Sequence, residues 1–171
     1  MGILVCGLNG SGKSTLGRAL AAALRLRFLD SEDLCFPDGR FDAPRTREEF
    51  LAALDAATRE GDFVFASVKG NGVQALRERI SLAIWVDAPR ETRLQRVRER
   101  SFRRFGERML PGGDLHAAEE RFFAQVASRS DEEMRAWAAQ LPWPVLRVDG
   151  TRPVQALVPE VCSWISETTG L

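Results

Sequence analysis

The stretch GLNGSGKST, residues 7–15, decides the fold of this chain. Gly7 is followed by four residues and then by Gly12, Lys13 and Ser14, which is the complete G-x-x-x-x-G-K-[ST] spacing of a phosphate-binding loop. In such a loop, glycine lets the backbone curl until successive amide groups point inward at phosphate oxygens. The expected ligand is the triphosphate tail of a nucleotide.

The sequence on either side of this loop fits a strand that leads into a helix. ILVCG (3–7) is a continuous apolar run, as expected for a strand buried on both faces of a parallel sheet. KSTLGRALAAALR (13–25) is rich in helix formers and places its leucines on one face. This order favours a nucleotide loop over the alternative, a glycine-rich turn that binds nothing.

Each residue of the loop has an expected role. Lys13 should reach the β- and γ-phosphates and take part in catalysis, and Ser14 should ligate magnesium. The other residues expected to bind the nucleotide are Asn9, Gly10, Ser11, Gly12 and Thr15. The cofactors that this loop implies are ATP and Mg²⁺.

Four further apolar runs predict strands, and helical patterns lie between them. The strands are expected at 27–30, 63–67, 82–87 and 144–149, and the helices at 46–61, 89–100, 115–127, 131–140 and from 153 onward. Alternating strands and helices imply right-handed crossovers and a parallel sheet of about five strands. We therefore predict an α/β protein with the three-layer α/β/α P-loop NTPase fold, as one domain over residues 1–171.

Composition and charge narrow the class of protein. The 24 basic and 24 acidic residues cancel, so a general nucleic-acid-binding surface is not expected. No apolar run approaches the roughly 20 residues of a membrane span, and the start of the chain lacks the features of a secretory signal. We expect a cytoplasmic protein without membrane contact.

Histidine and cysteine usage excludes several kinds of site. His116 is the only histidine, which argues against Ser-His-Asp triads and multi-histidine metal centres. Cys6, Cys35 and Cys162 are far apart and form no CxxC pair, so neither a disulfide framework nor a zinc site is predicted. Acid and base chemistry must therefore fall to carboxylates and arginines.

Several segments together resemble the small P-loop metabolite kinases, of which shikimate, gluconate and adenylate kinase are examples. After the phosphate loop come, in order, FLDSED, VFASVKG, IWVDAPRETRLQRVRER and VLRVDGTRP. The resemblance covers nearly the whole chain, but only the phosphate loop is highly specific. It implies ATP on that loop, an acceptor site above the sheet, an arginine lid, and a last loop, DGTRP, that wraps adenine.

The segment DSED places two carboxylates where this family handles its acceptor. It is similar to the acidic stretch after the second strand of shikimate and gluconate kinases, so Asp30 would sit near magnesium or accept the acceptor's proton. Glu32 would hold acceptor hydroxyls. The residues alone also suit Asp30, because phosphoryl transfer needs a carboxylate and this strand is expected next to the first. A loop-capping acid is the alternative.

One departure concerns the acceptor. The glycine triplet of shikimate kinases after the third strand is replaced by SVKGNG, which is closer to the S-A-L-K type of gluconate kinases. Arg45 and Lys69 are placed to bind an anionic group on the acceptor, although a surface role is an equal alternative. Phe36 and Phe41, which flank the turn at Asp38, could wall the acceptor pocket.

An arginine cluster predicts a lid that closes on the phosphates. Arg93, Arg96 and Arg100 lie on one helix face, and three more arginines follow in a segment read as a mobile loop, about 101–114. Those three are Arg103, Arg104 and Arg108. We assign Arg100 to nucleotide binding and Arg103 to catalysis; a solvated charged face is the alternative.

These observations favour a magnesium- and ATP-dependent kinase that acts on a hydroxyl or phosphate of a small polar metabolite. The sequence suits a polyol, a sugar acid or a nucleotide as the acceptor, and it leaves the oligomeric state open. The alternative is a nucleotide-binding regulator or partner-binding ATPase without a small acceptor. In that case Trp137 and Trp143 would belong to the contact surface.

Overall fold

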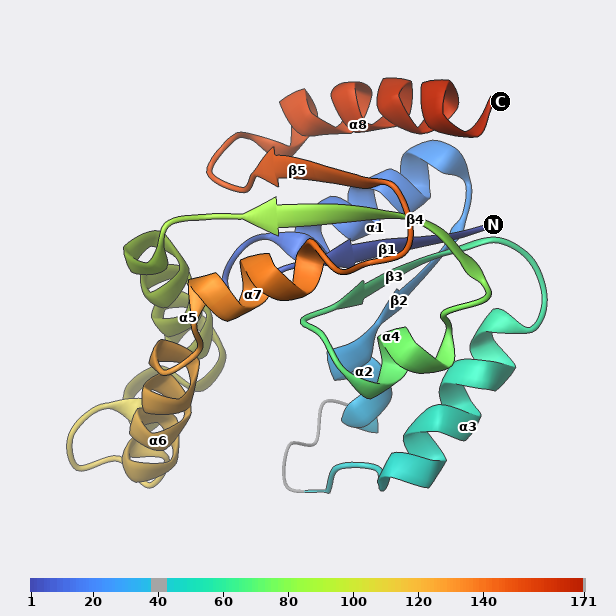
Figure 1. Ribbon diagram of the computed structural model, residues 1–171. Coiled ribbons are helices and arrows are strands. Elements are labelled where there is room, and N and C mark those ends of the chain that lie inside the picture. Colours follow the sequence, from blue (N-terminus) through green and yellow to red (C-terminus); the bar gives the residue numbers. More distant parts are fainter. Residues whose placement is uncertain (38–42, 171) are drawn as a thin grey trace.

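The computed structural model describes residues 1–37 and 43–170, which form a five-stranded parallel sheet between two layers of helices (Figure 1). The strand order is β2-β3-β1-β4-β5. The strands are β1 Gly2–Cys6, β2 Arg27–Asp30, β3 Phe63–Ser67, β4 Ile80–Asp87 and β5 Val145–Asp149. The predicted three-layer α/β/α fold is confirmed.

Helices connect the strands and follow the last one. They are α1 Lys13–Leu24, α2 Ser31–Cys35, α3 Arg47–Thr58, α4 Asn71–Ala75, α5 Arg90–Phe105, the 3-10 helix η2 Gly106–Met109, α6 His116–Ala127, α7 Asp131–Ala138 and α8 Val154–Thr169. Thr46 and Glu49 form the capping box expected at the start of α3.

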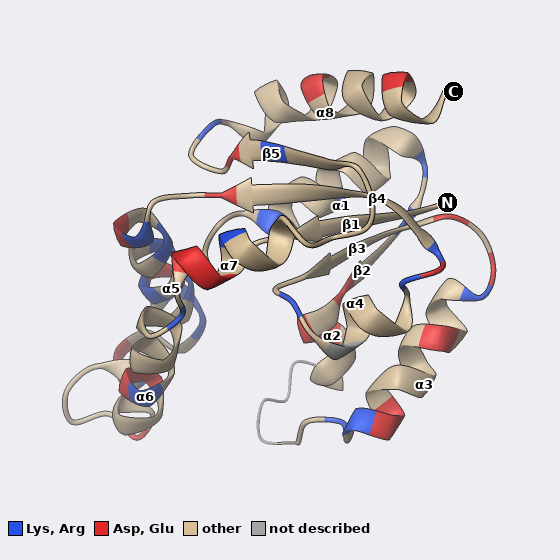
Figure 2. Cartoon of the chain, viewed as in Figure 1, with Lys and Arg blue, Asp and Glu red and all other residues tan. Residues whose placement is uncertain are grey.

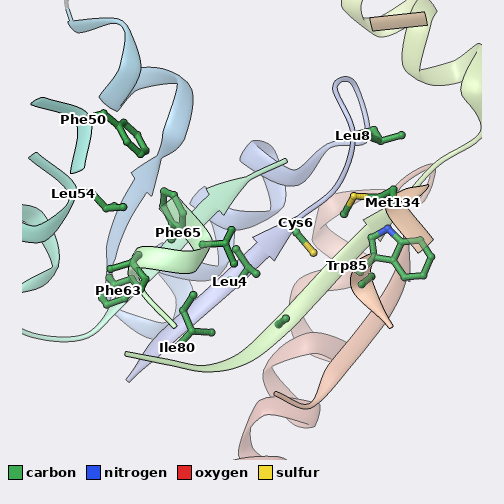
Figure 3. Close-up of a cluster of buried hydrophobic side chains, with 14 residues drawn as sticks. Leu4, Cys6, Leu8, Phe50, Leu54, Phe63, Phe65, Ile80, Trp85 and Met134 are labelled. Carbon is green, nitrogen blue, oxygen red and sulfur yellow. The ribbon is translucent and has the colours of Figure 1, made fainter. Parts of the chain in front are cut away.

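The side chains of β1 alternate between two apolar cores, one on each face of the sheet. Leu4 and Cys6 pack with the core beneath α3, α4 and α7, in which Figure 3 shows Phe65, Trp85 and Met134. The other side chains of β1 pack with α1 and α8 on the opposite face. Because both faces are covered, β1 and β3 read as uninterrupted apolar runs in the sequence.

The position of β2 differs from the prediction. We expected Asp30 to end a strand next to β1, but β3 lies between β1 and β2. The first crossover therefore skips one strand position, which β3 later fills by pairing Cys6 with Ser67 and Ala66 with Asp30. Parallel pairing still brings the carboxyl ends of all three strands to one edge of the sheet.

The expectation of irregular structure over 102–114 is wrong for its first half. Helix α5 continues to Phe105, and η2 follows directly after the helix ends at Gly106, where φ is 57°. The two helices pack against α6 around a small apolar core of their own, made of Val97, Met109, Phe123 and Val126. The segment forms an arm of α5, η2 and α6 that projects from the body of the molecule (Figure 1).

Two short helices lie in segments for which the sequence pattern predicts no helix. Helix α2 follows β2 directly, and α4 follows β3. Each spans five residues, so neither could show helical periodicity in the sequence. Among the described residues, every helix is too short or too polar to cross a membrane.

Candidate active site

The phosphate loop lies at the centre of the sheet edge, between the end of β1 and the start of α1. Gly10 and Gly12 adopt φ values of 81° and 103°, which favour glycine. A Cβ atom at Gly10 would lie 2.2 Å from the carbonyl oxygen of Arg93, so the loop packs directly on the first turn of α5. Glycine is therefore needed at position 10 for both reasons.

Two polar side chains of the loop are buried without a hydrogen-bond partner in the described parts of the chain. They are Asn9, which is 9% exposed, and Ser11, which is fully buried, and the orphaned atoms are Oδ1 and Oγ. Buried polar groups normally find a partner, so such atoms mark a place that is built for a ligand or water. This fits a loop that binds phosphate oxygens.

Lys13 is the buried cation of the site. Its side chain is only 8% exposed. Burial lowers its pKa, while the nearby carboxylates of Asp30 and Glu32 raise the pKa and the cations Arg100 and Arg129 lower it further. The expected residues Lys13, Asp30, Glu32 and Arg100 are therefore brought within electrostatic reach of one another.

Asp30 also caps a helix. Its Oδ1 accepts a hydrogen bond of 2.9 Å from the backbone N–H of Glu32, and it begins α2 as the N-cap residue. The capping role that was the alternative for Asp30 is therefore real. The side chain is 7% exposed, and its charge acts on Lys13, so capping fixes the carboxylate beside the phosphate loop.

Glu32 and Arg100 connect α2 with the arm. Their side chains approach to 3.9 Å and are partly exposed, so this is a weak contact in water. Ser14 is partly buried at the start of α1, beside Lys13. Within residues 1–37 and 43–170 no group of three or more acidic, histidine or cysteine side chains could hold a metal by itself. A magnesium ion here would need phosphate oxygens as well as Ser14 and Asp30.

Arg129 joins the site although the sequence did not point to it. It lies in the turn between α6 and α7, and its charge lowers the pKa of Lys13. Two anchors hold this turn against α5, because Arg90 donates a hydrogen bond of 2.7 Å to the carbonyl of Ala127 and Arg93 is paired with Asp131. A single arginine between two predicted helices carries no motif, so only the fold could reveal it.

Basic residues gather along α5 (Figure 2), and their contacts divide them into two groups. Arg93 is 1% exposed and also donates to the carbonyl of Ala88, so it holds the structure together and does not belong to a lid. Arg96 donates to the carbonyls of Gly10, Ser11 and Gly150, at 3.4, 3.4 and 2.8 Å. The assignment of Arg93 and Arg96 to the lid is therefore corrected.

The remaining arginines of the cluster lie farther along the arm. Arg103 is exposed and follows Arg96 and Arg100 on the same face of α5, at helical spacing. Arg104 lies over the ring of Phe105. Arg108 forms an exposed ion pair of 2.6 Å with Asp114, which raises the pKa of Arg108. Arg103 is thus the one of the three that continues the face of Arg96 and Arg100 along the arm, away from the start of α5.

The two cations assigned to the acceptor have protein partners. Arg45 donates a hydrogen bond of 2.8 Å to the carbonyl of Leu34 and so fastens the end of α2. Lys69 is paired with Glu133 at 3.5 Å, and both side chains are exposed. Phe36 lies within the described residues, whereas Phe41 and the turn at Asp38 lie outside them.

A cavity of about 260 Å³ adjoins the phosphate loop on the side of α1 and α8. Its lining combines Thr15 and Arg96 with the backbone of Gly150 and the apolar side chains of Val154 and Leu157. Apolar walls with a few polar groups suit a flat ring such as a nucleobase. The cavity lies beside the predicted adenine loop, DGTRP.

Trp137 and Trp143, which the alternative reading places on a contact surface, are not fully exposed. Both side chains are partly buried and pack against the core that α7 covers. Both also line one cavity of about 310 Å³, which is separate from the cavity beside the phosphate loop.

Known proteins match most of the length of this chain. Residues 3–107 match the family described as AAA domain (AAA_18). The shikimate kinase of Symbiobacterium thermophilum is 35% identical over 151 residues, which cover 74% of this chain and 83% of that enzyme. The uncharacterized protein YqaC of Bacillus subtilis (strain 168) is 29% identical over 175 residues, which cover 96% of this chain and 97% of YqaC.

A solved structure shows the same fold over the whole length. The crystal structure of shikimate kinase from Aquifex aeolicus matches with a TM-score of 0.60 at 17% identity, over 99% of this chain and 98% of that one. At this identity the likeness concerns the fold.

Proposed function

The chain belongs to the AAA domain family and to the small-molecule P-loop kinases, and from this premise we propose that it transfers a phosphoryl group from ATP to a small polar metabolite. The observation that carries the proposal is the gathering of Lys13, Asp30, Glu32, Arg100 and Arg129 at the phosphate loop. This set combines the cations and the carboxylate that phosphoryl transfer requires.

The phosphate loop would hold the nucleotide. Ser14 and Asp30 would hold Mg²⁺ together with phosphate oxygens of ATP, and the ion would neutralise part of the charge of the transferred group. Lys13 would reach the terminal phosphates, and the amides around Gly10 would bind their oxygens. The base of the nucleotide fits the cavity beside Thr15 and Gly150, which supports the orientation of the phosphates toward Lys13.

Asp30 would act on the acceptor. Its carboxylate is held by the cap of α2 and lies near Lys13, so it can accept the proton of a hydroxyl that attacks the terminal phosphorus. When the acceptor group is itself a phosphate, no such proton needs to leave and Asp30 serves only to hold magnesium. Glu32 on α2, Arg45 just before α3 and Lys69 in the turn after β3 would orient the acceptor.

The arginines would stabilise the negative charge on the phosphoryl group during transfer. Arg100 and Arg129 lie close enough to Lys13 to change its pKa, and Arg103 follows Arg100 on the arm. Guanidinium groups suit phosphate oxygens because they donate parallel hydrogen bonds. The cytoplasm, which supplies both ATP and Mg²⁺, is the compartment we propose for this reaction.

The test is a screen for ADP release over polyols, sugar acids and nucleotides, with water as the only acceptor in the control. We expect at least one metabolite to raise ADP release above the water control. Lys13→Ala should abolish MgATP binding, and unchanged ATP affinity in this variant would contradict the proposal.

Asp30 requires two substitutions because it has two roles. Asp30→Asn keeps a good helix cap but removes the charge, whereas Asp30→Ala removes both. We expect the Asn variant to bind ATP and to lose transfer by about 10² or more, the usual contribution of a general base. Wild-type rates in Asp30→Asn would remove Asp30 from this role. If Asp30→Ala fails to fold while Asp30→Asn folds, the helix cap is the role of Asp30 that the fold depends on.

A further inference from the structure

A second cavity lies outside the proposed kinase site, between α4 and the segment that joins α7 to β5. Its volume is about 310 Å³. Its lining includes two tryptophans, Trp137 and Trp143, and Gln74, Arg77 and Gln140 add polar groups. Figure 1 shows α4 and α7 on the same face of the sheet.

The tryptophan rings form the apolar part of this cavity. Both are partly buried and pack against the core on this face of the sheet, together with Leu141. A ring held by packing loses little conformational freedom when a ligand stacks on it, so binding costs less entropy. Tryptophan is also the side chain that offers the largest apolar and aromatic surface to a flat ring.

The polar side chains at the cavity have no partner among the residues that the structure describes. The amides of Gln74 and Gln140 and the guanidinium of Arg77 are exposed and make no hydrogen bond or ion pair there. Arg79, by contrast, is held by Asp55 at 2.6 Å and by Thr58 at 2.8 Å. Arg77 therefore presents an uncompensated positive charge at the cavity.

The residues that line the cavity include no acid. An anionic ligand would therefore meet Arg77 without a competing carboxylate in the lining. The two amides can donate to its oxygens as well as accept from ring nitrogens.

From this combination we propose that the cavity binds a planar aromatic ring that carries an anionic group, with the ring against Trp137 and Trp143 and the anion at Arg77. The site is separate from the nucleotide site, because no residue lines both this cavity and the one beside the phosphate loop. It lies next to the acceptor edge, since Gly70 follows Lys69 and Trp137 lies one helical turn after Glu133.

The experiment uses a matched pair of fluorescent probes on the whole chain. 1-Anilinonaphthalene-8-sulfonate carries a planar ring system and a sulfonate, and N-phenyl-1-naphthylamine is its neutral analogue. We expect the sulfonate probe to bind at one site, with energy transfer from tryptophan, and saturating MgATP to leave this binding unchanged.

Variants that change the charge at the cavity test whether Arg77 binds the anionic group. Arg77→Gln should weaken binding of the sulfonate probe about fivefold, as expected for an exposed ion pair, and leave the neutral probe unaffected. Arg135→Gln is the control, because Arg135 is exposed on α7, does not line this cavity and changes the net charge equally. Gln140→Glu should also weaken the sulfonate probe alone. All three positions are exposed, so the variants should fold as the wild type does.

Three results would overturn the proposal. They are no binding of the sulfonate probe at a single site, an equal effect of Arg77→Gln and Arg135→Gln, and displacement of the probe by MgATP. None of these results depends on whether the chain transfers phosphate, so they leave the proposed kinase activity to its own test.

Discussion

Gly10 is the residue at which the phosphate loop comes closest to α5, and it offers a direct test of that contact. Gly61 has nearly the same φ, 82° against 81°, but a Cβ atom there would meet nothing within 4 Å. Gly61→Ala should therefore cost only the conformational strain, about 1 kcal/mol. Gly10→Ala adds a clash with the backbone of Arg93 and should cost about 3 kcal/mol in the free energy of unfolding.

Urea denaturation of the two variants measures this difference. MgATP affinity, measured by calorimetry, should fall in Gly10→Ala and stay unchanged in Gly61→Ala. Equal loss of stability in the two variants would mean that α5 moves away from the loop at little cost.

Lys13 links stability to pH because burial lowers its pKa from the ordinary lysine value of 10.5. Between the lowered pKa and 10.5, the unfolded chain binds more protons than the folded chain, so stability rises with pH across this alkaline window. Below the lowered pKa the buried charge is a constant cost. Lys13→Met removes the charge and keeps the length of the side chain.

We expect Lys13→Met to stabilise the nucleotide-free protein at pH 7 by about 1 kcal/mol, although it abolishes the binding of ATP. The urea midpoint of the variant should lose the rise of the wild type at alkaline pH. Lower stability of Lys13→Met at neutral pH would show that Asp30 and Glu32 more than offset the cost of burying the charge.

Single residues of the site were predictable to different degrees. The motif spacing fixes the roles expected of Lys13 and Ser14, and an acid at a strand end suggested Asp30. Arg96 and Arg129 gave no comparable signal, because their places depend on how α5 and the turn after α6 pack on the phosphate loop. Helical spacing grouped Arg93 with the lid, but it could not show that Asp131 would bury it.

At the scale of the elements, the ion pair of Arg93 with Asp131 anchors the turn between α6 and α7 to α5. Arg93 is almost completely buried, whereas Asp131 is 44% exposed. Asp131→Asn would leave the buried guanidinium without its counter-charge and should cost about 2 kcal/mol, less than for a fully buried pair because Asp131 is itself partly solvated and the asparagine oxygen can still accept a hydrogen bond from Arg93. Since the turn carries Arg129, turnover should fall as well.

Asp114→Asn is the matched control for this substitution. Asp114 is paired with Arg108 in an exposed ion pair on the arm, so its loss should leave the urea midpoint unchanged. If the two variants behave alike, the Arg93 pair contributes no more than a surface contact and the turn has another anchor.

The strands were predictable because a sheet covered by helices on both faces requires continuous apolar strands. In the sequence these strands are apolar runs that end at glycine or at charged residues. The strand order was not, since no local pattern says that the first crossover skips a position. The end of α5 was missed for a related reason. Glycines and prolines after Arg100 suggested a loop, but contacts of Met109 and Phe123 with Val97 keep the segment helical.

The molecule as a whole joins two segments that lie far apart in the chain. Arg96 binds carbonyls of both the phosphate loop and Gly150, and a Cβ atom at Gly150 would lie 2.2 Å from the carbonyl oxygen of Ser11. We expect MgATP to slow amide hydrogen exchange in residues 7–15 and 150–154 together, because both line the proposed nucleotide site.

The same hydrogen-exchange measurement on Arg96→Ala with MgATP tests whether Arg96 couples the two segments. Protection of 7–15 should persist at saturating nucleotide, while protection of 150–154 should be lost. Unchanged protection of both segments would show that the packing of Gly150 against Ser11 suffices without the guanidinium.

The contact between Gly10 and Arg93 also makes α5 a lever. The fulcrum lies at the phosphate loop, where the backbones touch, and the far end carries Arg103 and the half-exposed ring of Phe102. The 12 residue-to-residue steps from Arg93 to Phe105 span about 18 Å, so a tilt of about 10° about the fulcrum displaces the tip by about 3 Å. A tilt too small to disturb the core could therefore carry a guanidinium the length of a hydrogen bond.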